Sequence, residues 1–583
     1  MTQRPIRIAN CSGFYGDRLT AMREQLEGGP ADHGVDVISG DYLAELTMLI
    51  LGKDQLRDPS LGYARTFLTQ VSDGLGLALD RGVRLVANAG GLNPSGLAAR
   101  LRETADTLGL SPRIAWVDGD NLAPRAAELG LDNALTANAY LGAFGIARAL
   151  EDGADIVVTG RVTDASLVVG PAVAHHGWSR ASYDELAGAV VAGHIIECGT
   201  QATGGNFSGF LDLARDATPL GFPLAEVAAD GSFVVTKHAG TGGVVSLDTV
   251  TAQLLYEVQS THYLGPDVTA DLASIRVTED GPDRVRVSGV RGAAPPEQLK
   301  VCVNELGGHR NQMEFVLTGL DVEEKAAWVR AQLEARLADE PPASVTWSLG
   351  SRPVADADTE EAASCLLRVV VKDPSAEVVG KPFSAAAVEL ALASYPGFTL
   401  TAPPGRGSPY GIYRAAYVDR GHVTETVHLP DGREVVVAQA EGSSAEPRAT
   451  EPAPTAPLPP SDSPTRCVPL GTFVHARSGD KGGDANVGLW IGRHREGEPD
   501  DLRDQRVAWL LHLVTPGHVR QLIPEATDLE VEVHALPNLG GVNVLIRGLL
   551  GDGVAASTRF DPQAKALGEW LRSRFVHVPQ DLL

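Results

Sequence analysis

The sequence predicts an α/β protein with a mainly parallel sheet in its body, an α+β second lobe, and a small ferredoxin-like α+β C-terminal domain. Three observations support this prediction. Short apolar strands alternate with helices in the first 170 residues, longer strand-like runs follow between 265 and 440, and a segment rich in proline, serine and alanine covers 441–466. Strands interleaved with helices are typical of βαβ units, which build parallel sheets.

The strand-like runs of the first 170 residues share one pattern: each ends in a glycine or a small polar residue. The runs are IRIANC, VDVISGD, VRLVANAG, RIAWVDGD and ADIVVTG. Because ligands of open α/β sheets bind at the carboxyl ends of the strands, we expect functional residues in the loops that follow these runs.

The segment 441–466 contains almost no large apolar side chains and is expected to form an extended spacer. We therefore predict a body at 1–440, with lobes at about 1–264 and 265–440, and a separate small domain at 467–583. The order of strand-like and helical runs in the small domain favours a ferredoxin-like arrangement.

Composition and charge exclude several classes of protein. The chain has 583 residues, of which 43% are hydrophobic, and 74 acidic against 49 basic residues give a net charge of −25. This charge repels nucleic acid and anionic membranes, so neither is an expected partner. An anionic small molecule would need a local site of backbone N–H groups and arginines.

The cysteines and the N-terminal segment indicate a cytoplasmic protein. Five widely spaced cysteines form no CxxC pair, which disfavours disulfides and a thiolate zinc site. The start of the chain lacks the pattern of a secretory leader, and no run of apolar residues is long enough for a membrane span. We expect no cofactor of the protein's own.

A glycine-rich turn follows the first predicted strand. Gly13 would free backbone N–H groups to approach an oxyanion or a phosphate, with Asp17 and Arg18 beside it. The pattern is neither GxGxxG nor a Walker loop, which weakens a dinucleotide interpretation. A tight turn in which Asp17 and Arg18 cap or pair is an equally good alternative.

Two further strand ends carry polar groups. Asn88, Gly90 and Gly91 end the run VRLVANAG, directly before a natural helix start at Asn93. Arg161 follows the run ADIVVTG and is the best candidate for binding a carboxylate, a phosphate or an oxyanion. The alternative for Arg161 is a structural ion pair with Asp164.

A third group of candidates lies near residue 200. His194 and Glu197 would share one face of a helix, a spacing compatible with a metal pair or with a base and its orienting partner, although a structural pair is the favoured interpretation. Cys198 is interpreted as a small buried hydrophobe. Gly204 and Gly205 follow in a glycine-rich turn and are candidates for substrate binding.

Two more turns concentrate titratable residues. His238 precedes a glycine-rich turn and is a candidate acid or base, provided that a partner lies within reach. In the small domain, His475, Asp480 and Lys481 belong to a charged, glycine-rich loop. That loop either binds an anion, inserts into the site of the body, or is simply solvated.

Together these blocks resemble the acyclic terpene utilisation AtuA family. The resemblance covers nearly the whole chain outside the predicted linker. It rests on the segments CSGFYGDR, NAGGLNP, VTGRVTDASL, HIIECGTQATGGN and HAGTGG in the body and HARSGDKGGDAN in the small domain. It implies a role in the catabolism of branched or acyclic terpenoids, whose intermediates are acyl-CoA esters.

We therefore expect an enzyme that acts on a branched acyl-CoA or a related carboxylate by hydration, hydrolysis or carbon–carbon lysis. Glu197 and His238 are the predicted acid–base pair, with Asp17 and Asp164 orienting them. The predicted substrate-binding residues are Gly13, Arg18, Asn88, Gly90, Gly91, Arg161, Gly204, Gly205, His475, Asp480 and Lys481.

The alternative is a non-catalytic subunit that binds an acyl-CoA carboxylase or hydratase through its small domain. In either case the expected partner is a small molecule, namely a coenzyme A ester. The chain is also expected to form a homo-oligomer. No metal is expected, although the His194 and Glu197 spacing leaves one open.

Overall fold

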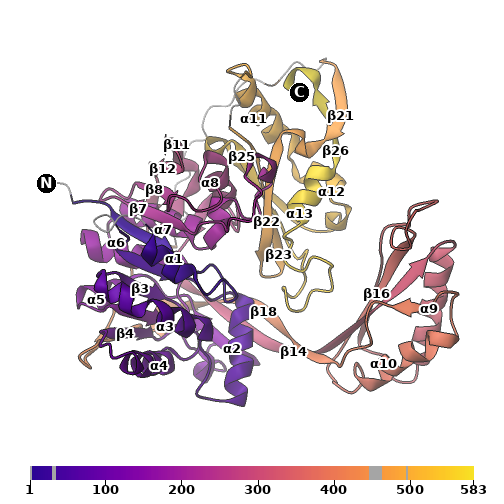
Figure 1. The fold of residues 1–583 in the computed structure, drawn as a ribbon, viewed down its shortest axis with the longest axis horizontal. Helices are drawn as coiled ribbons and strands as arrows, with labels where there is room; N and C mark the ends of the chain where they lie inside the picture. The colour runs from indigo at the N-terminus through magenta and orange to yellow at the C-terminus, as the bar shows by residue number, and fades with distance from the viewer. Residues whose placement is uncertain (1–2, 29–33, 445–457, 459–462, 494–496) are drawn as a thin grey trace. The chain divides into compact units, whose positions relative to one another are not determined.

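The computed structural model describes residues 3–28, 34–444, 458, 463–493 and 497–583. The chain forms two compact units (Figure 1). The first consists of Met1–Asn304, Tyr413–Val554 and Asp561–Leu583, and the second of Glu305–Ile412 and Ala555–Phe560. The predicted linker at 441–466 lies for the most part outside the described residues, so the predicted domain boundaries stay a prediction.

The first unit is built on a mixed sheet. Its central strands are parallel, in the spatial order β1 (Ile6–Asn10), β2 (Val37–Gly40), β3 (Arg84–Ala87), β6 (Ile156–Thr159) and β4 (Ile114–Asp118). Antiparallel strands extend both sides: β7 (Pro223–Val227), β8 (Phe233–Lys237), β12 (Arg284–Ser288) and β11 (Arg276–Gly281) beyond β1, and β19 (Thr426–His428) and β20 (Glu434–Val436) beyond β4. Mixed α/β content is therefore confirmed. A mainly parallel body is not, because antiparallel strands continue the sheet on both sides.

The short apolar strands are buried on both faces because helices cover each of them. Val37 and Val157 pack into one apolar core, whereas their neighbours Ile38 and Val158 pack into the other. This follows from the alternation of side chains along a strand. The helices of the first core are α5 (Phe144–Glu151), α6 (Ser166–His176) and α7 (Tyr183–Ile196), and those of the second are α1 (Ala21–Glu27), α3 (Arg65–Asp80) and α4 (Pro94–Thr107).

Local signals place two of these helices. The Asn93 side chain accepts a hydrogen bond of 2.9 Å from the N–H of Gly96 and starts α4 ahead of Pro94, as the sequence predicts. Helix α7 is buried at every position from Leu186 to Ile196, because its sequence is apolar on all sides. Its C-terminal end therefore lies deep inside the unit, which positions the residues that follow it.

Further elements of the first unit surround the strand ends. They are α2 (Glu45–Arg57), β5 (Ala134–Ala139), α8 (Leu247–Leu254) and a three-stranded sheet of β9 (His262–Leu264), β10 (Thr269–Asp271) and β13 (Arg291–Ala293). The segment after α8 meets the small domain: the N–H of Glu257 donates to the Asn486 side chain at 2.8 Å, and the side chains of Asn486 and Asn543 both donate to the carbonyl of Val258.

The C-terminal residues of the first unit form an antiparallel four-stranded sheet in the order β22 (Val474–Lys481), β23 (Asp484–Ile491), β25 (Gly541–Ile546) and β24 (Val531–Leu536). Helices α11 (Leu502–Leu513), α12 (Pro516–Leu522) and α13 (Leu567–Ser573) and the ribbon of β21 (Thr465–Pro469) with β26 (Phe575–Pro579) share its core. The charged segment at 475–486 is not a loop but a hairpin, in which Lys481 pairs with Asp484 across Gly482 and Gly483. Gly482 has a positive φ of 67°, which such tight turns require.

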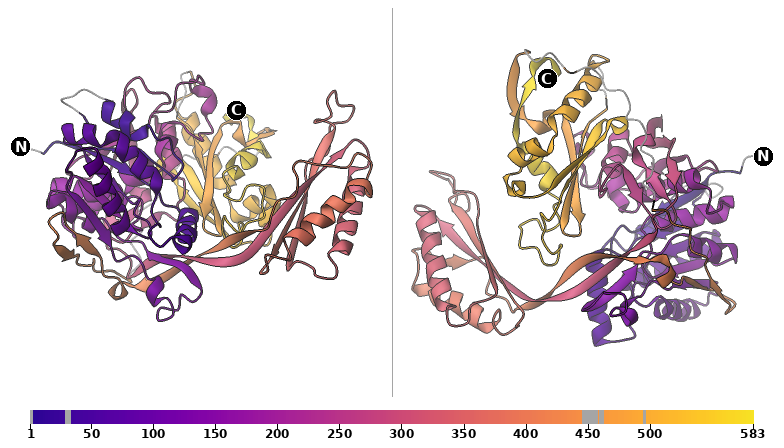
Figure 2. Two further views of the ribbon diagram at one scale, coloured as in Figure 1. Left: turned by 60° about the horizontal axis from the view of Figure 1, so that its bottom comes forward. Right: turned by 180° about the vertical axis from the view of Figure 1, so that it is seen from behind.

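The second unit is a smaller α+β structure. Its sheet has the order β15 (Ser344–Leu349), β16 (Ser364–Asp373), β14 (Gln298–Thr318) and β17 (Thr399–Leu400), with β18 (Ser408–Asp419) also pairing with β14. The residues of β14 up to Asn304 and those of β18 from Tyr413 belong to the first unit. Helices α9 (Val322–Arg336) and α10 (Lys381–Val388) share a core with this sheet (Figure 2). Of the strand-like runs between 265 and 440, RVRVSGV contributes β12 to the large sheet rather than to this one.

Candidate functional site

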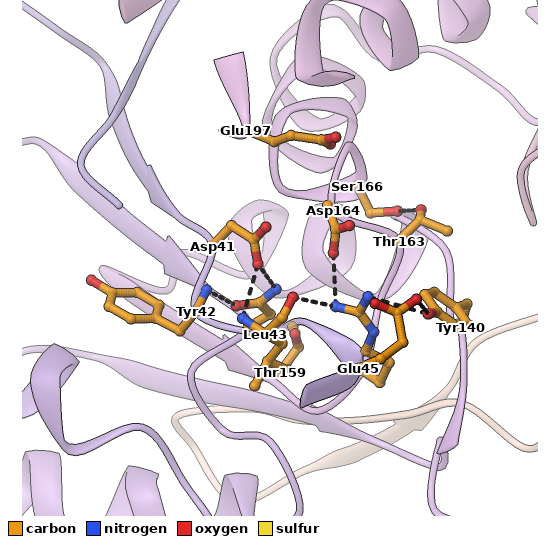
Figure 3. Close-up of polar contacts among 12 residues, drawn as sticks. Asp41, Tyr42, Leu43, Glu45, Tyr140, Thr159, Thr163, Asp164, Ser166 and Glu197 are labelled. Atoms are coloured by element: carbon orange, nitrogen blue, oxygen red, sulfur yellow. Dashed lines mark hydrogen bonds and ion pairs between the residues drawn. The ribbon is translucent and has the colours of Figure 1, made fainter. Parts of the chain in front are cut away.

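Polar residues follow three adjacent parallel strands at one edge of the large sheet. Asp41 follows β2, Asn88 follows β3, and Arg161 and Asp164 lie in the loop after β6. Because β2, β3 and β6 are neighbours and parallel, their carboxyl ends meet at this edge and bring these side chains together (Figure 3).

Asp41 is held in place by the Asn88 side chain. Nδ2 of Asn88 donates to Oδ1 of Asp41 at 2.6 Å, and Oδ1 of Asn88 accepts from the N–H of Tyr42 at 2.8 Å. The N–H of Leu43 donates to the same Asp41 oxygen at 3.1 Å. Asp41 is only 6% exposed and Asn88 is fully buried. This carboxyl therefore accepts from two donors, the Asn88 amide and the N–H of Leu43.

Arg161 is occupied by groups of the protein itself. Its Nη1 donates to Asp164 at 2.8 Å and to the carbonyl of Leu43 at 2.9 Å, and its Nη2 donates to the Tyr140 hydroxyl at 3.3 Å. The guanidinium also lies 4.5 Å from the centre of the Tyr140 ring. The predicted structural pair between Arg161 and Asp164 is thus present. Asp164 keeps 27% of its side chain accessible, whereas Arg161 keeps 3%.

Helix α7 ends in a buried pair of a histidine and a glutamate. Nδ1 of His194 lies 3.2 Å from Oε1 of Glu197, so the two residues share one face of the helix as predicted. Burial lowers the pKa of His194 to about 4, which leaves the ring neutral. Nε2 of His194 and Oε2 of Glu197 are both buried without a hydrogen-bond partner among the described residues.

Three carboxyl groups converge at this position. Burial raises the pKa values of Asp41, Asp164 and Glu197, and the charge of Asp164 raises those of Asp41 and Glu197 further. The Arg161 guanidinium acts in the opposite direction on all three. Burial and mutual repulsion therefore favour the protonated forms of these carboxyls.

The hairpin of the small domain adds a charged tip to these carboxyls. Although burial opposes the charge of Lys481, surrounding acids raise its pKa, so the ammonium stays ionised. These acids are Glu257, Glu45, Glu197 and Asp164. Burial and then Glu257 raise the pKa of Asp480 to about 7. Two of the three small-domain residues predicted from sequence therefore reach the carboxyls of the body.

Other predicted site residues serve the structure at different places. Nε2 of His238 contacts the carbonyl of Gln25 at 3.2 Å, and burial lowers the pKa of this ring. The predicted pairing of Glu197 with His238 must be corrected, because the histidine beside Glu197 is His194. Asp17 accepts from the N–H of Gly13 at 2.6 Å.

Arg18 and His475 are likewise engaged elsewhere. Arg18 forms an ion pair with Glu24 at 2.6 Å and donates to the carbonyl of Leu220. His475 lies at the start of β22, where Nδ1 contacts the Ser208 hydroxyl at 3.1 Å. It belongs to the contact between body and small domain and is separated from Lys481 by most of the strand.

The glycines predicted to bind substrate have structural reasons of their own. Four amides already donate within the protein: Gly13 to Asp17, Gly91 to Asn88, Gly204 to Gln201 and Gly205 to Thr200. A Cβ at Gly90 would lie 2.5 Å from the carbonyl oxygen of Thr159. These glycines allow chains to cross closely, and an oxyanion site built from them is not supported.

Several residues of the site were not predicted from sequence. They are Asp41, Glu45, Tyr140, Glu257, Lys300 and Tyr413. Asp41 has a signal, since it ends the strand-like run VDVISGD in the same way that Asn88 ends its own. The others lie on separate elements that only the tertiary fold brings together.

Cys198 and the metal hypothesis can be placed as well. Burial raises the pKa of the Cys198 thiol well above its usual range, which leaves it protonated and unsuited as a nucleophile. In the part of the chain that the structure describes, no three or more histidine, cysteine and acidic side chains are arranged to hold a metal ion. None of the described helices has the length and hydrophobicity of a membrane span.

The fold and the site define a mixed α/β protein in which a small C-terminal domain contributes charged residues to buried carboxyls of the body. Residues 6–429 match the family model of the acyclic terpene utilisation family protein AtuA, and residues 468–577 match the model of the AtuA ferredoxin-like domain. The first match covers more than half of the chain, and the chain belongs to the AtuA family. No curated protein sequence matches it.

Proposed function

We propose that the protein is an enzyme of acyclic or branched terpenoid catabolism that acts on an acyl-CoA thioester or a related carboxylate by general acid–base catalysis. The observation that carries this proposal is the convergence of Asp41, Asp164 and Glu197, whose burial and mutual repulsion favour their protonated forms. Family membership supports the pathway, and the site supports the type of chemistry.

Hydration of an unsaturated thioester suits such a group of carboxyls. One carboxylate takes a proton from water as the water oxygen bonds to the β-carbon. The electron pair of the double bond moves to the α-carbon, which takes a proton from a second, protonated carboxyl. Glu197 and Asp41 are the candidates for these roles, since Asp164 is paired with Arg161.

Carbon–carbon lysis would use the same groups. A carboxylate removes the proton of a β-hydroxyl, the bond between the α- and β-carbons breaks, and the α-carbon of the enolate takes a proton from the acid. Hydrolysis through a covalent intermediate has less support, because the Cys198 thiol is not activated. A lyase, in either the hydrating or the carbon–carbon cleaving sense, is therefore the class that we propose.

The test is turnover of a panel of branched acyl-CoA esters, both unsaturated and β-hydroxylated, with products followed by mass spectrometry. We expect wild type to convert at least one ester and Glu197→Gln and Asp41→Asn to lose about 10²-fold or more of kcat. Glu425→Gln is the matched control, because Glu425 is also a buried carboxyl but lies outside the site, near Asp267. Its activity should equal that of wild type.

Two outcomes would contradict the proposal. Turnover that survives both Glu197→Gln and Asp41→Asn would remove the carboxyls from the chemistry. Absence of turnover for every ester, together with co-purification of a carboxylase or hydratase, would instead favour the non-catalytic subunit.

A further inference from the structure

A second group of residues adjoins the three carboxyls and is rich in positive charge. It consists of Lys300 on β14, Lys481 at the end of β22, Glu45 at the start of α2, Tyr140 after β5, and Tyr413 on β18. All five belong to the first unit. Lys481 connects this group to the three carboxyls, since it also interacts electrostatically with Glu197 and Asp164.

Ring contacts bring Lys300 close to the hairpin turn that follows Lys481. Nζ of Lys300 lies 4.9 Å from the centre of the Tyr140 ring and 5.9 Å from that of Tyr413. The Tyr413 ring in turn packs against the hairpin turn, because a Cβ at Gly482 would lie 2.5 Å from it. Lys481 directly precedes this glycine. Burial lowers the pKa of Lys300, Glu45 opposes this effect, and the charge of Lys481 lowers the pKa by a smaller amount.

Neither ammonium has a direct partner. Among the described residues, no hydrogen bond or ion pair involves Nζ of Lys300 or of Lys481, although both side chains are partly accessible. The Tyr413 hydroxyl is buried and has no hydrogen-bond partner within the described chain. Three donors from different elements therefore have unused hydrogen-bonding capacity in the same region.

Glu45 is the acid that these lysines share, and it is ionised. Burial would raise its pKa, but Lys300, Arg161 and Lys481 together lower it to about 2. Its Oε1 accepts from the Tyr140 hydroxyl at 3.2 Å. Glu257 is a second acid near Lys481 and raises the pKa of that lysine most. Neither acid forms a direct ion pair with Nζ of Lys300 or Lys481 among the described residues, and Glu197 and Asp164 tend to hold protons.

We infer that Lys300 and Lys481 form a subsite for a carboxylate of the substrate, with the Tyr413 hydroxyl as a third donor. This inference rests on the proposed function and specifies its substrate class: an acyl thioester that also carries a free carboxylate. Lysine ammonium groups bind such an anion as point charges.

A phosphate of coenzyme A has the same kind of chemistry, but the position of the subsite favours the carboxylate. Lys481 belongs to the subsite and also interacts electrostatically with Glu197 and Asp164, so an anion bound there would lie on the side of the proposed acid–base groups. The phosphates of coenzyme A are separated from the thioester by the whole pantetheine arm.

Calorimetric titration of the full chain tests the inference without turnover. The probes are glutarate, as an unreactive carboxylate, and adenosine 3′,5′-bisphosphate, as the phosphate-bearing part of coenzyme A. We expect wild type and Glu197→Gln to bind glutarate, and Lys300→Met and Lys481→Met each to bind it about ten- to a hundred-fold more weakly. Lys300→Arg, which keeps the charge, should retain most of the affinity.

Lys372→Met is the matched control. Nζ of Lys372 also lies 4.9 Å from the centre of a tyrosine ring, that of Tyr410, but in the second unit. Its substitution removes one charge and one ring contact and should leave glutarate binding unchanged. Melting temperatures of all variants show whether a loss of binding reflects unfolding. If the methionine variants are unfolded, glutarate binding by Lys300→Arg tests the inference instead.

The inference is overturned if wild type does not bind glutarate, if both methionine variants bind it as wild type does, or if the two lysines are needed for the bisphosphate but not for glutarate. These results differ from a failure of the proposed function. Lysine-dependent glutarate binding by a protein that converts no ester would leave the subsite standing and remove the reaction.

Discussion

Asn88 fixes Asp41 through a 2.6 Å hydrogen bond from Nδ2, while its own Oδ1 is fixed by the backbone N–H of Tyr42. The amide can therefore take only one orientation, and it presents a donor to the carboxylate. This hydrogen bond lowers the pKa of Asp41 against the larger opposing effects of burial and of Asp164. Asn88 thus acts as a positioning residue whose removal should change both the geometry and the titration of Asp41.

Asn88→Ala should lower kcat by about ten- to a hundred-fold and shift the limb of the pH profile that Asp41 sets to higher pH. The shift follows because the lost hydrogen bond stabilised the ionised form of Asp41. The measurement is kcat as a function of pH. Gln25→Ala is the control, since this buried amide donates to Phe222 outside the site and should lower stability without moving the profile. An unchanged profile in Asn88→Ala would remove the positioning role.

The turn of the small-domain hairpin offers a test of Lys481. Gly482 and Gly548 have similar positive φ values of 67° and 72°, so alanine at either should cost about 1–2 kcal/mol of stability. A Cβ at Gly482 also meets the Tyr413 ring, whereas one at Gly548 meets nothing within 4 Å. Gly482→Ala should therefore displace Lys481 and lower kcat/KM, and Gly548→Ala should lower stability alone. Equal activities would show that the position of the hairpin tip is unimportant.

Glu425, a buried acid outside the site, should make the stability of the protein depend on pH. Burial and then Asp267 raise the pKa of Glu425 from 4.5 to about 8, at a side chain only 4% exposed. Between these values the folded protein holds a proton that the unfolded chain releases. The contribution of Glu425 to stability is therefore fully present below pH 4.5 and is lost as the pH rises through 8.

Glu425→Gln should remove this loss. We expect the variant to match wild type at about pH 5 and to be more stable at about pH 9 by roughly 2–4 kcal/mol. Chemical denaturation at the two pH values provides the measurement. Glu340→Gln, at an exposed position, should follow wild type at both. If the Glu425→Gln variant loses stability with pH as wild type does, another group is responsible.

The sequence predicts the outline of the fold and part of the site, and the limits have physical causes. Strand ends such as Asn88 and Arg161 are visible because an apolar run followed by a polar residue is a local pattern. The antiparallel edges of the large sheet are less visible, since strands such as β12 and β19 pair with partners far along the chain. Their sequences indicate that they form strands but do not indicate with which other strand each one pairs.

The predicted role of the glycines is wrong for a related reason. The sequence suggests that the N–H groups of Gly13 and Gly91 are available to a ligand. In the fold, each of these N–H groups already donates to an acceptor within the protein. Lys300 carried no signal, because its role depends on Tyr140 and on the hairpin tip, which are distant in sequence. The pair of His194 and Glu197 was predictable, because its geometry is set within one helix turn.

The ion pair of Arg161 and Asp164 allows a test of how Arg161 is stabilised in the fold. Its stabilisation comes mainly either from the charge of Asp164 or from the hydrogen bonds to Leu43 and Tyr140. Arg161→Met leaves Asp164 without its 2.8 Å ion pair, next to two other acids, and removes the hydrogen bonds to Leu43 and Tyr140. Loss of one member of a buried pair costs about 3–5 kcal/mol, whereas loss of both costs less. The double variant Arg161→Met/Asp164→Asn should therefore be more stable than Arg161→Met alone. Denaturant titration of the two single variants, the double variant and wild type measures this coupling. If the two substitutions simply add, Arg161 is held by Leu43 and Tyr140 rather than by the charge of Asp164.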